Sequence, residues 1–421
     1  MIKRLIAIVA TACAWCACAA ISSSRLDLER TAAIYHSYEF HESDGAPAPK
    51  GFKPFYIAHY GRHGSRMLTG EYLSRALSTF EKADGNNALT VTGRDLLHML
   101  RRVSDLHSGM VGQLSARGAE EQRTLAKRMA KRFPDVFRGR RKVRCQATTY
   151  PRALVSQMNF VVSLKESAPY LELGFATGDK VERLLLHPRR DFEGVLPQIK
   201  DMVKEKLGEG TSLPMFLGRY FKNLNDIGNP DELAMQLIRC FSICQCLRDE
   251  LDGMDMYRFA SYDEISALSH CFEANVYAMM GNSNEFGDRV VWSAVSLAKD
   301  FVERADEAIS DRNIAADLRF GHDAGLWPLA GLMDLEGPGD RAPVTESWRF
   351  CPAWKWMPMA ANIQLVFYRN SDDDEVLVKI LFNEREMRVR GLSLRGWPYY
   401  HWQELRDHIL KSADEAAKIC P

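Results

Sequence analysis

The sequence predicts an α/β protein, with a central and mostly parallel sheet, flanking helices and a large inserted α-helical domain. Strand-like runs alternate with helical patterns up to about residue 165 and again after residue 310. Between them, residues 166–310 carry helix and loop patterns with few strand signals. We therefore predict one core built from residues 20–165 and 311–421, interrupted by a helical insertion at 166–310.

The first 19 residues have the pattern of an export signal. Lys3 and Arg4 give a positive start, residues 5–16 are apolar, and residues 17–19 form a small-residue cleavage site. The apolar run is too short to span a bilayer comfortably. We expect cleavage after Ala19 and a periplasmic or secreted protein. Lipidation of a leader cysteine is the less favoured alternative, because the preceding residues fit a lipidation motif poorly.

Charge and length exclude some classes of protein. The 421 residues include 55 basic and 55 acidic side chains, so the formal net charge is zero. A nucleic-acid-binding protein would have a strong excess of basic residues. We therefore do not expect this protein to bind nucleic acid. The length is sufficient for two domains or for one domain with a large insertion. No stretch after the leader reaches membrane-spanning length without charges.

Seven cysteines follow the leader, and an odd number leaves at least one without a partner in the chain. Some pairing is expected in an oxidising compartment, but the sequence does not give it. The spacing of Cys240, Cys244 and Cys246 is also that of a metal cluster. A helical pattern over 237–251 favours buried thiols instead, and no second Cys/His pair at zinc spacing follows. The seven are Cys145, Cys240, Cys244, Cys246, Cys271, Cys351 and Cys420.

The elements of the first half follow from local patterns. A β-like run at 55–60 opens the core after a Pro- and Gly-containing lead-in. Helical spacing follows at 70–82 and at 94–103. Ser115 is placed to cap a further helix that ends near residue 133, ahead of Pro134.

The remaining elements complete the alternation. A short strand is predicted at 143–148 and a helix at 152–166. After the insertion, a strand at 316–321 precedes a helix near 328–333. The runs 363–368 and 376–382 form a hairpin around a polar turn, and a helix covers about 402–418.

Three of these strands end in residues that suit one chemical task. The first is followed by Arg62-His63-Gly64-Ser65-Arg66, the second by Arg152, and the third by His322 and Asp323. In α/β sheets, ligands bind beyond the carboxyl ends of strands, so these side chains are expected to converge. Guanidinium groups match phosphate oxygens and stay charged at any working pH, and Gly64 would let backbone and ligand come close.

This set predicts phosphoryl transfer in two steps. His63 attacks phosphorus, while Arg62, Arg66, Arg152 and His322 hold the equatorial oxygens. Protonated Asp323 is the acid for the leaving alcohol, which predicts an acidic optimum. The guanidiniums supply the positive charge, so we expect neither metal nor cofactor.

The motifs resemble those of the histidine acid phosphatases, branch two of the histidine phosphatase superfamily. The resemblance covers nearly the whole chain after the leader: residues 60–66, 113–118, Arg152, and Gly321-His322-Asp323. It implies that His63 is the nucleophile, that Arg62, Arg66, Arg152 and His322 bind phosphate, and that Asp323 donates the proton.

The segment 53–66 is similar to multiple inositol polyphosphate phosphatases and their bacterial relatives, which implies phytate as substrate. Two positions depart from that pattern: Leu68 stands where proline is usual, and His322-Asp323-Ala324 is the form found in phytases and general acid phosphatases, where the multiple-type enzymes have His-Ala-Glu. A general acid phosphatase acting on sugar or nucleotide phosphates is therefore the alternative.

Two readings of other kinds remain. A non-catalytic surface protein that binds phosphate ligands would need neither His63 nor Asp323. A mutase of the cytoplasmic branch is disfavoured by the export signal and the insertion. Further substrate contacts are expected from the insertion, which would cap the site. Arg183, Arg189 and Arg190 near its start are candidates, although each one taken alone is more often a solvated surface residue.

Overall fold

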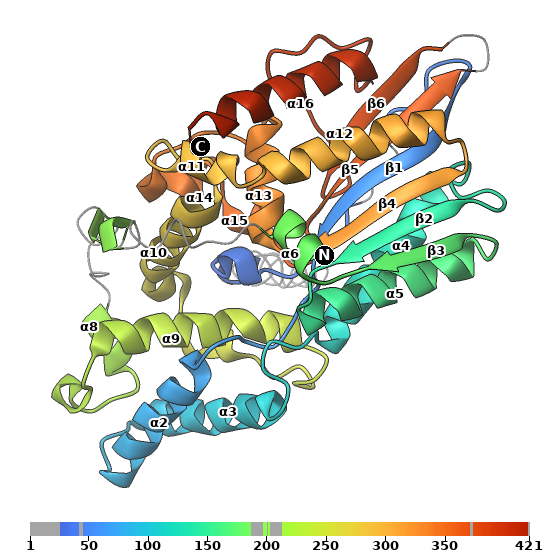
Figure 1. Ribbon diagram of the computed structural model, residues 1–421. Helices are drawn as coiled ribbons and strands as arrows, with labels where there is room; N and C mark the ends of the chain where they lie inside the picture. Colours follow the sequence, from blue (N-terminus) through green and yellow to red (C-terminus); the bar gives the residue numbers. More distant parts are fainter. Residues whose placement is uncertain are drawn as a thin grey trace, which may run out of the picture.

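An eight-stranded mixed sheet forms the centre of the molecule (Figure 1). The computed structural model describes residues 26–41, 45–186, 197–199, 201–202, 213–370 and 374–419. The strand order is β3-β2-β4-β1-β5-β6-β7, with β8 paired to β6. The strands are β1 (Phe52–Arg62), β2 (Lys142–Ala147), β3 (Glu172–Ala176), β4 (Ile314–Gly321), β5 (Asn362–Asn370), β6 (Val376–Phe382), β7 (Arg385–Glu386) and β8 (Tyr400–His401).

The strands β1, β2, β3 and β4 run parallel, which confirms the predicted α/β class and its mostly parallel core. The predicted hairpin is also present, because β5 and β6 pair antiparallel. In the parallel half, Arg62 at the end of β1 pairs with Gly321 of β4, and Ala147 of β2 pairs with Phe320. The carboxyl ends of β1, β2 and β4 therefore lie together at one edge of the sheet.

Helices cover both faces of the sheet. In Figure 1, α4 (Ala116–Arg132) and α5 (Pro151–Ser167) lie on one side, and α12 (Val295–Ser310) and α16 (Trp402–Ala417) lie on the other. Every residue of β4 is buried, as expected for a parallel strand covered on both faces. The predicted cap of α4 is confirmed, since the Ser115 side chain accepts a hydrogen bond from the Gly118 amide.

A group of helices lies beyond the carboxyl edge of the sheet (Figure 1). It contains α9 (Pro230–Ile243) and α10 (Tyr262–Met280) from the predicted insertion, together with α2 (Tyr72–Gly85) and α3 (Val91–His107) from the connection after β1. The helix α2 packs against α9. The insertion range also supplies β3 to the sheet edge. The division at 165 and 310 stays a prediction. Further helices are α6 (Asp179–Leu185), α8 (Leu213–Gly218), α11 (Gly287–Trp292) and α13 (Asp323–Leu332).

Cys145, Cys240, Cys244, Cys246 and Cys351 are buried and form no disulfide among the described residues, so the expected pairing is not found among these five. Cys420 lies outside the described ranges. The thiol of Cys244 donates to the carbonyl of Cys240, one helical turn earlier, at 3.2 Å. Burial raises the pKa of Cys240 to about 12, so this thiol is protonated in the helix.

The predicted leader, residues 1–19, also lies outside the described ranges. Among the helices that the structure describes, none is both long enough and apolar enough to cross a membrane.

Candidate active site

The loop after β1 is fixed at the carboxyl edge of the sheet by its backbone. The amide of His63 donates to the carbonyl of Gly321 at 3.0 Å, and the carbonyl of His63 accepts from the amide of Ala360 at 2.9 Å. His63 is thus held between the end of β4 and the start of β5. The hydrophobic strand β1 thus brings His63 to this edge of the sheet, and the backbone at the end of β4 and next to the start of β5 orients it.

Gly64 is required by packing against a second glycine. A Cβ on Gly64 would lie 2.4 Å from the carbonyl oxygen of Gly118, and a Cβ on Gly118 would lie 2.0 Å from that of Ser65. Both glycines are needed because the loop touches the first turn of α4. The expectation that Gly64 also lets a ligand approach the backbone stays a prediction.

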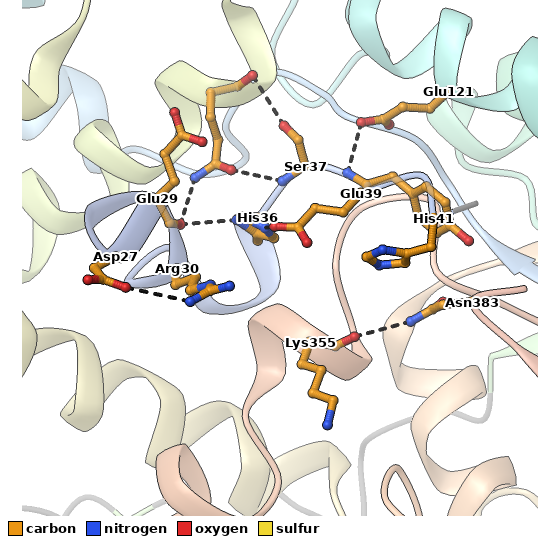
Figure 2. A network of polar contacts seen from close by, with 12 residues as sticks. Asp27, Glu29, Arg30, His36, Ser37, Glu39, His41, Glu121, Lys355 and Asn383 are labelled. Carbon is orange, nitrogen blue, oxygen red and sulfur yellow. Dashed lines mark hydrogen bonds and ion pairs between the residues drawn. The ribbon is translucent and has the colours of Figure 1, made fainter. Parts of the chain in front are cut away.

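A buried carboxylate on α4 holds the same loop. Glu121 accepts from the Ser65 amide at 2.7 Å, from the Ser65 hydroxyl at 2.8 Å and from the Tyr38 amide at 3.2 Å. Figure 2 shows Glu121 reaching the backbone of the segment 26–41, to which Tyr38 belongs. The next residue, Gln122, donates to the Arg62 carbonyl at 3.1 Å. No local pattern identifies either side chain, because their partners lie 56 to 83 residues away in the chain.

We predict that Glu121→Ala lowers the free energy of unfolding by about 2 to 3 kcal/mol, since three donors lose a buried charged acceptor. Denaturant unfolding measures this loss. Glu120→Ala is the matched control, because Glu120 is an exposed neighbour on the same helix and its partners in the described part of the chain are Arg123 and Thr124, within one turn. Equal unfolding curves for the two variants would contradict the assigned role of Glu121.

His63 is buried and its neutral tautomer is defined by its surroundings. Its Nδ1 lies 2.9 Å from the carbonyl oxygen of Gly64, which can only accept, so Nδ1 carries the proton and Nε2 keeps its lone pair. Burial lowers the pKa of His63 well below 6.5, and the charges of Arg62 and Arg152 lower it further. The imidazole is therefore neutral, and nucleophilic at Nε2, well into the acidic range.

His322 lies beside His63, with ring centroids 5.4 Å apart. Its Nε2 lies 3.0 Å from the hydroxyl of Thr148, and its Nδ1 lies 3.5 Å from the guanidinium of Arg152. Because a guanidinium only donates, Nδ1 accepts and Nε2 carries the proton. Burial and then the charge of Arg152 lower the pKa of His322 to about 3.

Asp323 is the first residue of α13, and its carboxylate lies 3.0 Å from the guanidinium of Arg62. Its Oδ1 also accepts from the amide of Ala324 at 2.9 Å. Arg62 is only 1% exposed and donates from Nη1 to the carbonyls of Ile34 and Met357 at 2.7 and 2.6 Å. These two carbonyls fix the guanidinium and leave Nη2 directed toward Asp323.

Arg66 and Arg152 complete the cationic part of the site. Arg66 donates to the Met67 carbonyl at 2.8 Å and lies over the ring of Tyr35 at 5.3 Å. Arg152 lies over the ring of Tyr150 at 4.6 Å. Burial, followed by the charge of Arg66, lowers the pKa of Arg152 to about 10, so it stays charged. The Nε groups of Arg62, Arg66 and Arg152 are buried without a hydrogen-bond partner among the described residues.

Three residues at the end of β2 were not singled out from the sequence. Thr148 contacts His322, as described above, and the ring of Tyr150 packs edge-on against the same imidazole with centroids 4.9 Å apart. The amide and hydroxyl of Thr149 both donate to Glu182 of α6, at 2.6 and 2.9 Å. Thr148 and Tyr150 could have been identified from the sequence, because they lie between β2 and Arg152. No feature of the sequence indicated Glu182.

The structure thus brings together Arg62, His63, Arg66, Arg152, His322 and Asp323 from three strand ends. Of the predicted additional contacts, Arg183 is exposed on α6, and no hydrogen bond or ion pair joins it to this group among the described residues. Arg189 and Arg190 lie outside the described ranges. Chemically, the group offers a neutral nucleophile, a carboxyl group and several cations around it.

No family model matches the chain, and no curated protein matches it either. Solved structures, however, do match the chain. The multiple inositol polyphosphate phosphatase of Bifidobacterium longum superposes with a TM-score of 0.78 at 17% identity, over 90% of this chain and 97% of that one; it was solved with inositol hexasulfate and with phosphate.

Two phytases are also similar. The D. castellii enzyme has a TM-score of 0.68 at 11% identity, covering 93% of this chain and 88% of its own. The Hafnia alvei enzyme has a TM-score of 0.54 at 12% identity, covering 88% and 99%. The fold implied by the resemblance is therefore confirmed: this chain has the fold shared by the multiple inositol polyphosphate phosphatase and these phytases.

Proposed function

We propose that the protein is a phosphomonoester hydrolase that works through a phosphohistidine intermediate, with inositol polyphosphates as its substrates. The observation that carries the proposal is the buried, neutral His63 surrounded by the guanidiniums of Arg62, Arg66 and Arg152. Buried Nε–H groups on these three arginines need acceptors, and the oxygens of a phosphoryl group would supply them.

In the first step, Nε2 of His63 attacks phosphorus and the bond from phosphorus to the ester oxygen breaks. Asp323, protonated, gives its proton to the departing alkoxide, so an alcohol leaves and Asp323 becomes a carboxylate. The arginines hold the equatorial oxygens, where charge is spread in the transition state. The negative charge of the bound phosphate pairs with Arg62 and favours a protonated neighbouring carboxyl.

In the second step, water attacks the phosphorus of phosphohistidine. The carboxylate of Asp323 accepts a proton from this water, and the phosphorus–nitrogen bond breaks. Inorganic phosphate leaves, His63 returns to its neutral form, and Asp323 is again protonated. The hydrogen bond from Nδ1 to the carbonyl of Gly64 keeps the ring in one orientation through both steps.

The pH dependence of turnover follows from the protonation states of His63 and Asp323. A histidine whose pKa is lowered remains unprotonated above that lowered value, so the nucleophile persists as pH falls through the range where a free histidine would be charged. The acid is needed in its protonated form, which acidic pH favours. We therefore expect turnover to rise from neutral toward acidic pH.

The substrate proposal is supported by the fold, since the B. longum enzyme was solved with inositol hexasulfate. The sequence His322-Asp323-Ala324 supports the alternative of a general acid phosphatase. The protein is also proposed to be exported, as residues 1–19 suggest.

Phosphate release from phytate and from an aryl phosphate, between about pH 3 and 7, tests the proposal. We expect faster release from phytate, with a maximum on the acidic side of the range. Release from the aryl ester alone would favour the general phosphatase. No release from either ester would overturn the hydrolase and leave phosphate binding as the function.

A further inference from the structure

The sheet ends in an open strand on the side of β3. In the described part of the chain, β3 pairs with β2 on one side and with no strand on the other (Figure 1). Gly174, Phe175 and Ala176 are exposed, and a Cβ on Gly174 would meet no atom within 4 Å. Residues 172–176 contain neither proline nor lysine, which commonly block pairing at an exposed edge. The outward backbone groups of β3 are therefore available to another extended strand.

An apolar groove lies beside this open strand, between β3 and α5. It has a volume of about 530 Å³ and is lined mainly by apolar side chains of the two elements. Met158 and Val162 of α5 are 60% and 54% exposed, and Phe175 of β3 is 60% exposed. Single exposed apolar residues are ordinary, but several gathered in one groove mark a binding surface. The groove and the open strand therefore form one continuous surface that a partner can cover.

The sequence of β3 is complementary to a second copy of itself. Leu173 and Phe175 both line the groove, as expected for side chains two positions apart on a strand. When two β3 strands pair antiparallel about Gly174, Leu173 of each copy lies opposite Phe175 of the other. Aliphatic–aromatic pairs across strands are favourable, and both of these pairs would lie on the face that carries α5. The glycine at the centre has no side chain to meet its own copy.

The area available is sufficient for a specific contact. Pairing would cover the exposed parts of Met158, Val162 and Phe175 together with the edge of β3, on the order of 500 Å² per copy. Two copies then bury roughly 1,000 Å², the lower limit for a specific interface. We propose that two copies of this chain associate through β3 and the groove beside it, as a two-fold symmetric dimer whose sheets join into one. The residues of the candidate active site do not line the groove, so dimerisation can be tested apart from the reaction.

Cross-linking tests the pairing of the two strands. In the proposed register, Gly174→Cys places two cysteines opposite each other with Cα atoms about 5 Å apart, within reach of a disulfide. We expect oxidation of this variant to give a covalent dimer on a non-reducing gel, above the background that wild type gives from its native cysteines. Ala176→Cys is the matched control, because it lies on the same face of β3 but about 14 Å from its own copy. No link in Gly174→Cys, or equal linking of both variants, overturns the proposed pairing.

Sedimentation measures the association without an added cysteine. We expect wild type to form dimers between about 1 and 100 μM, and Phe175→Asp and Met158→Glu each to weaken the dimer at least about tenfold, because each places a charge in the groove. The two variants lie on different elements, so a folding defect in one does not decide the result. Val91→Asp is the control, since it replaces a similarly exposed apolar side chain of α3 and should leave association unchanged. Wild type that stays monomeric throughout overturns the inference, and binding of that monomer to lipid vesicles would assign the groove to a membrane surface instead.

Discussion

His63→Ala is expected to reduce phosphate release from every ester at least about a thousandfold, because the variant has no nitrogen to form the covalent intermediate. Phosphate binding should survive, since the guanidiniums of Arg62, Arg66 and Arg152 remain. Steady-state turnover measures the loss, and titration with inorganic phosphate measures what is kept. The reaction and the binding are thereby separated in one variant.

The control for this prediction is His98→Ala, which removes an exposed histidine from α3. It should leave both turnover and binding near their wild-type values. Trapping with acid after mixing with labelled substrate should give labelled protein in wild type and none in His63→Ala. Turnover retained by His63→Ala would contradict the phosphohistidine route, and loss of phosphate binding together with turnover would point to a structural effect instead.

Asp323→Asn is expected to discriminate between leaving groups. An alkoxide needs a proton as it departs, whereas a nitrophenolate does not. We therefore predict a loss of about a hundredfold to ten-thousandfold for alkyl phosphates, and a loss below about tenfold in the first step for a nitrophenyl ester. Asparagine keeps an oxygen to accept from the Ala324 amide, so the start of α13 should be retained.

The pH profile gives Asp323→Asn a second test. Wild-type turnover of an alkyl phosphate should fall as pH rises toward neutral, because the acid loses its proton. The variant should lack that dependence while the Arg62 side chain, still held by the carbonyls of Ile34 and Met357, binds phosphate as before. Equal losses for both kinds of ester would show that Asp323 acts on the position of Arg62 rather than on the leaving group.

Local sequence patterns were sufficient to predict most helices and strands. The apolar run at 55–60 became part of β1, the cap at Ser115 begins α4, and the runs at 363–368 and 376–382 form the antiparallel pair β5–β6. These features depend on residues within one turn or one strand, so their signals lie in neighbouring positions. The same holds for the three strand ends, whose carboxyl edges meet because the strands are parallel.

What the sequence could not give depends on contacts between distant residues. The strand β3 within the predicted insertion, and the helices α2 and α3 that join the helical part, follow from which surfaces cover one another. Cys246 forms no disulfide among the described residues, and its thiol donates instead to the carbonyl of Tyr35, 211 residues away, a partner that no local pattern indicates.

The sequence by itself determined the class of fold, the order of the strand ends and the residue types gathered there. Only the tertiary structure decided that Gly64 is required by Gly118 and that Glu121 holds Ser65. The physical reason is the range of the interactions. Periodicity and caps act over a few residues, whereas backbone packing, buried charge and ring stacking depend on partners that folding alone brings together.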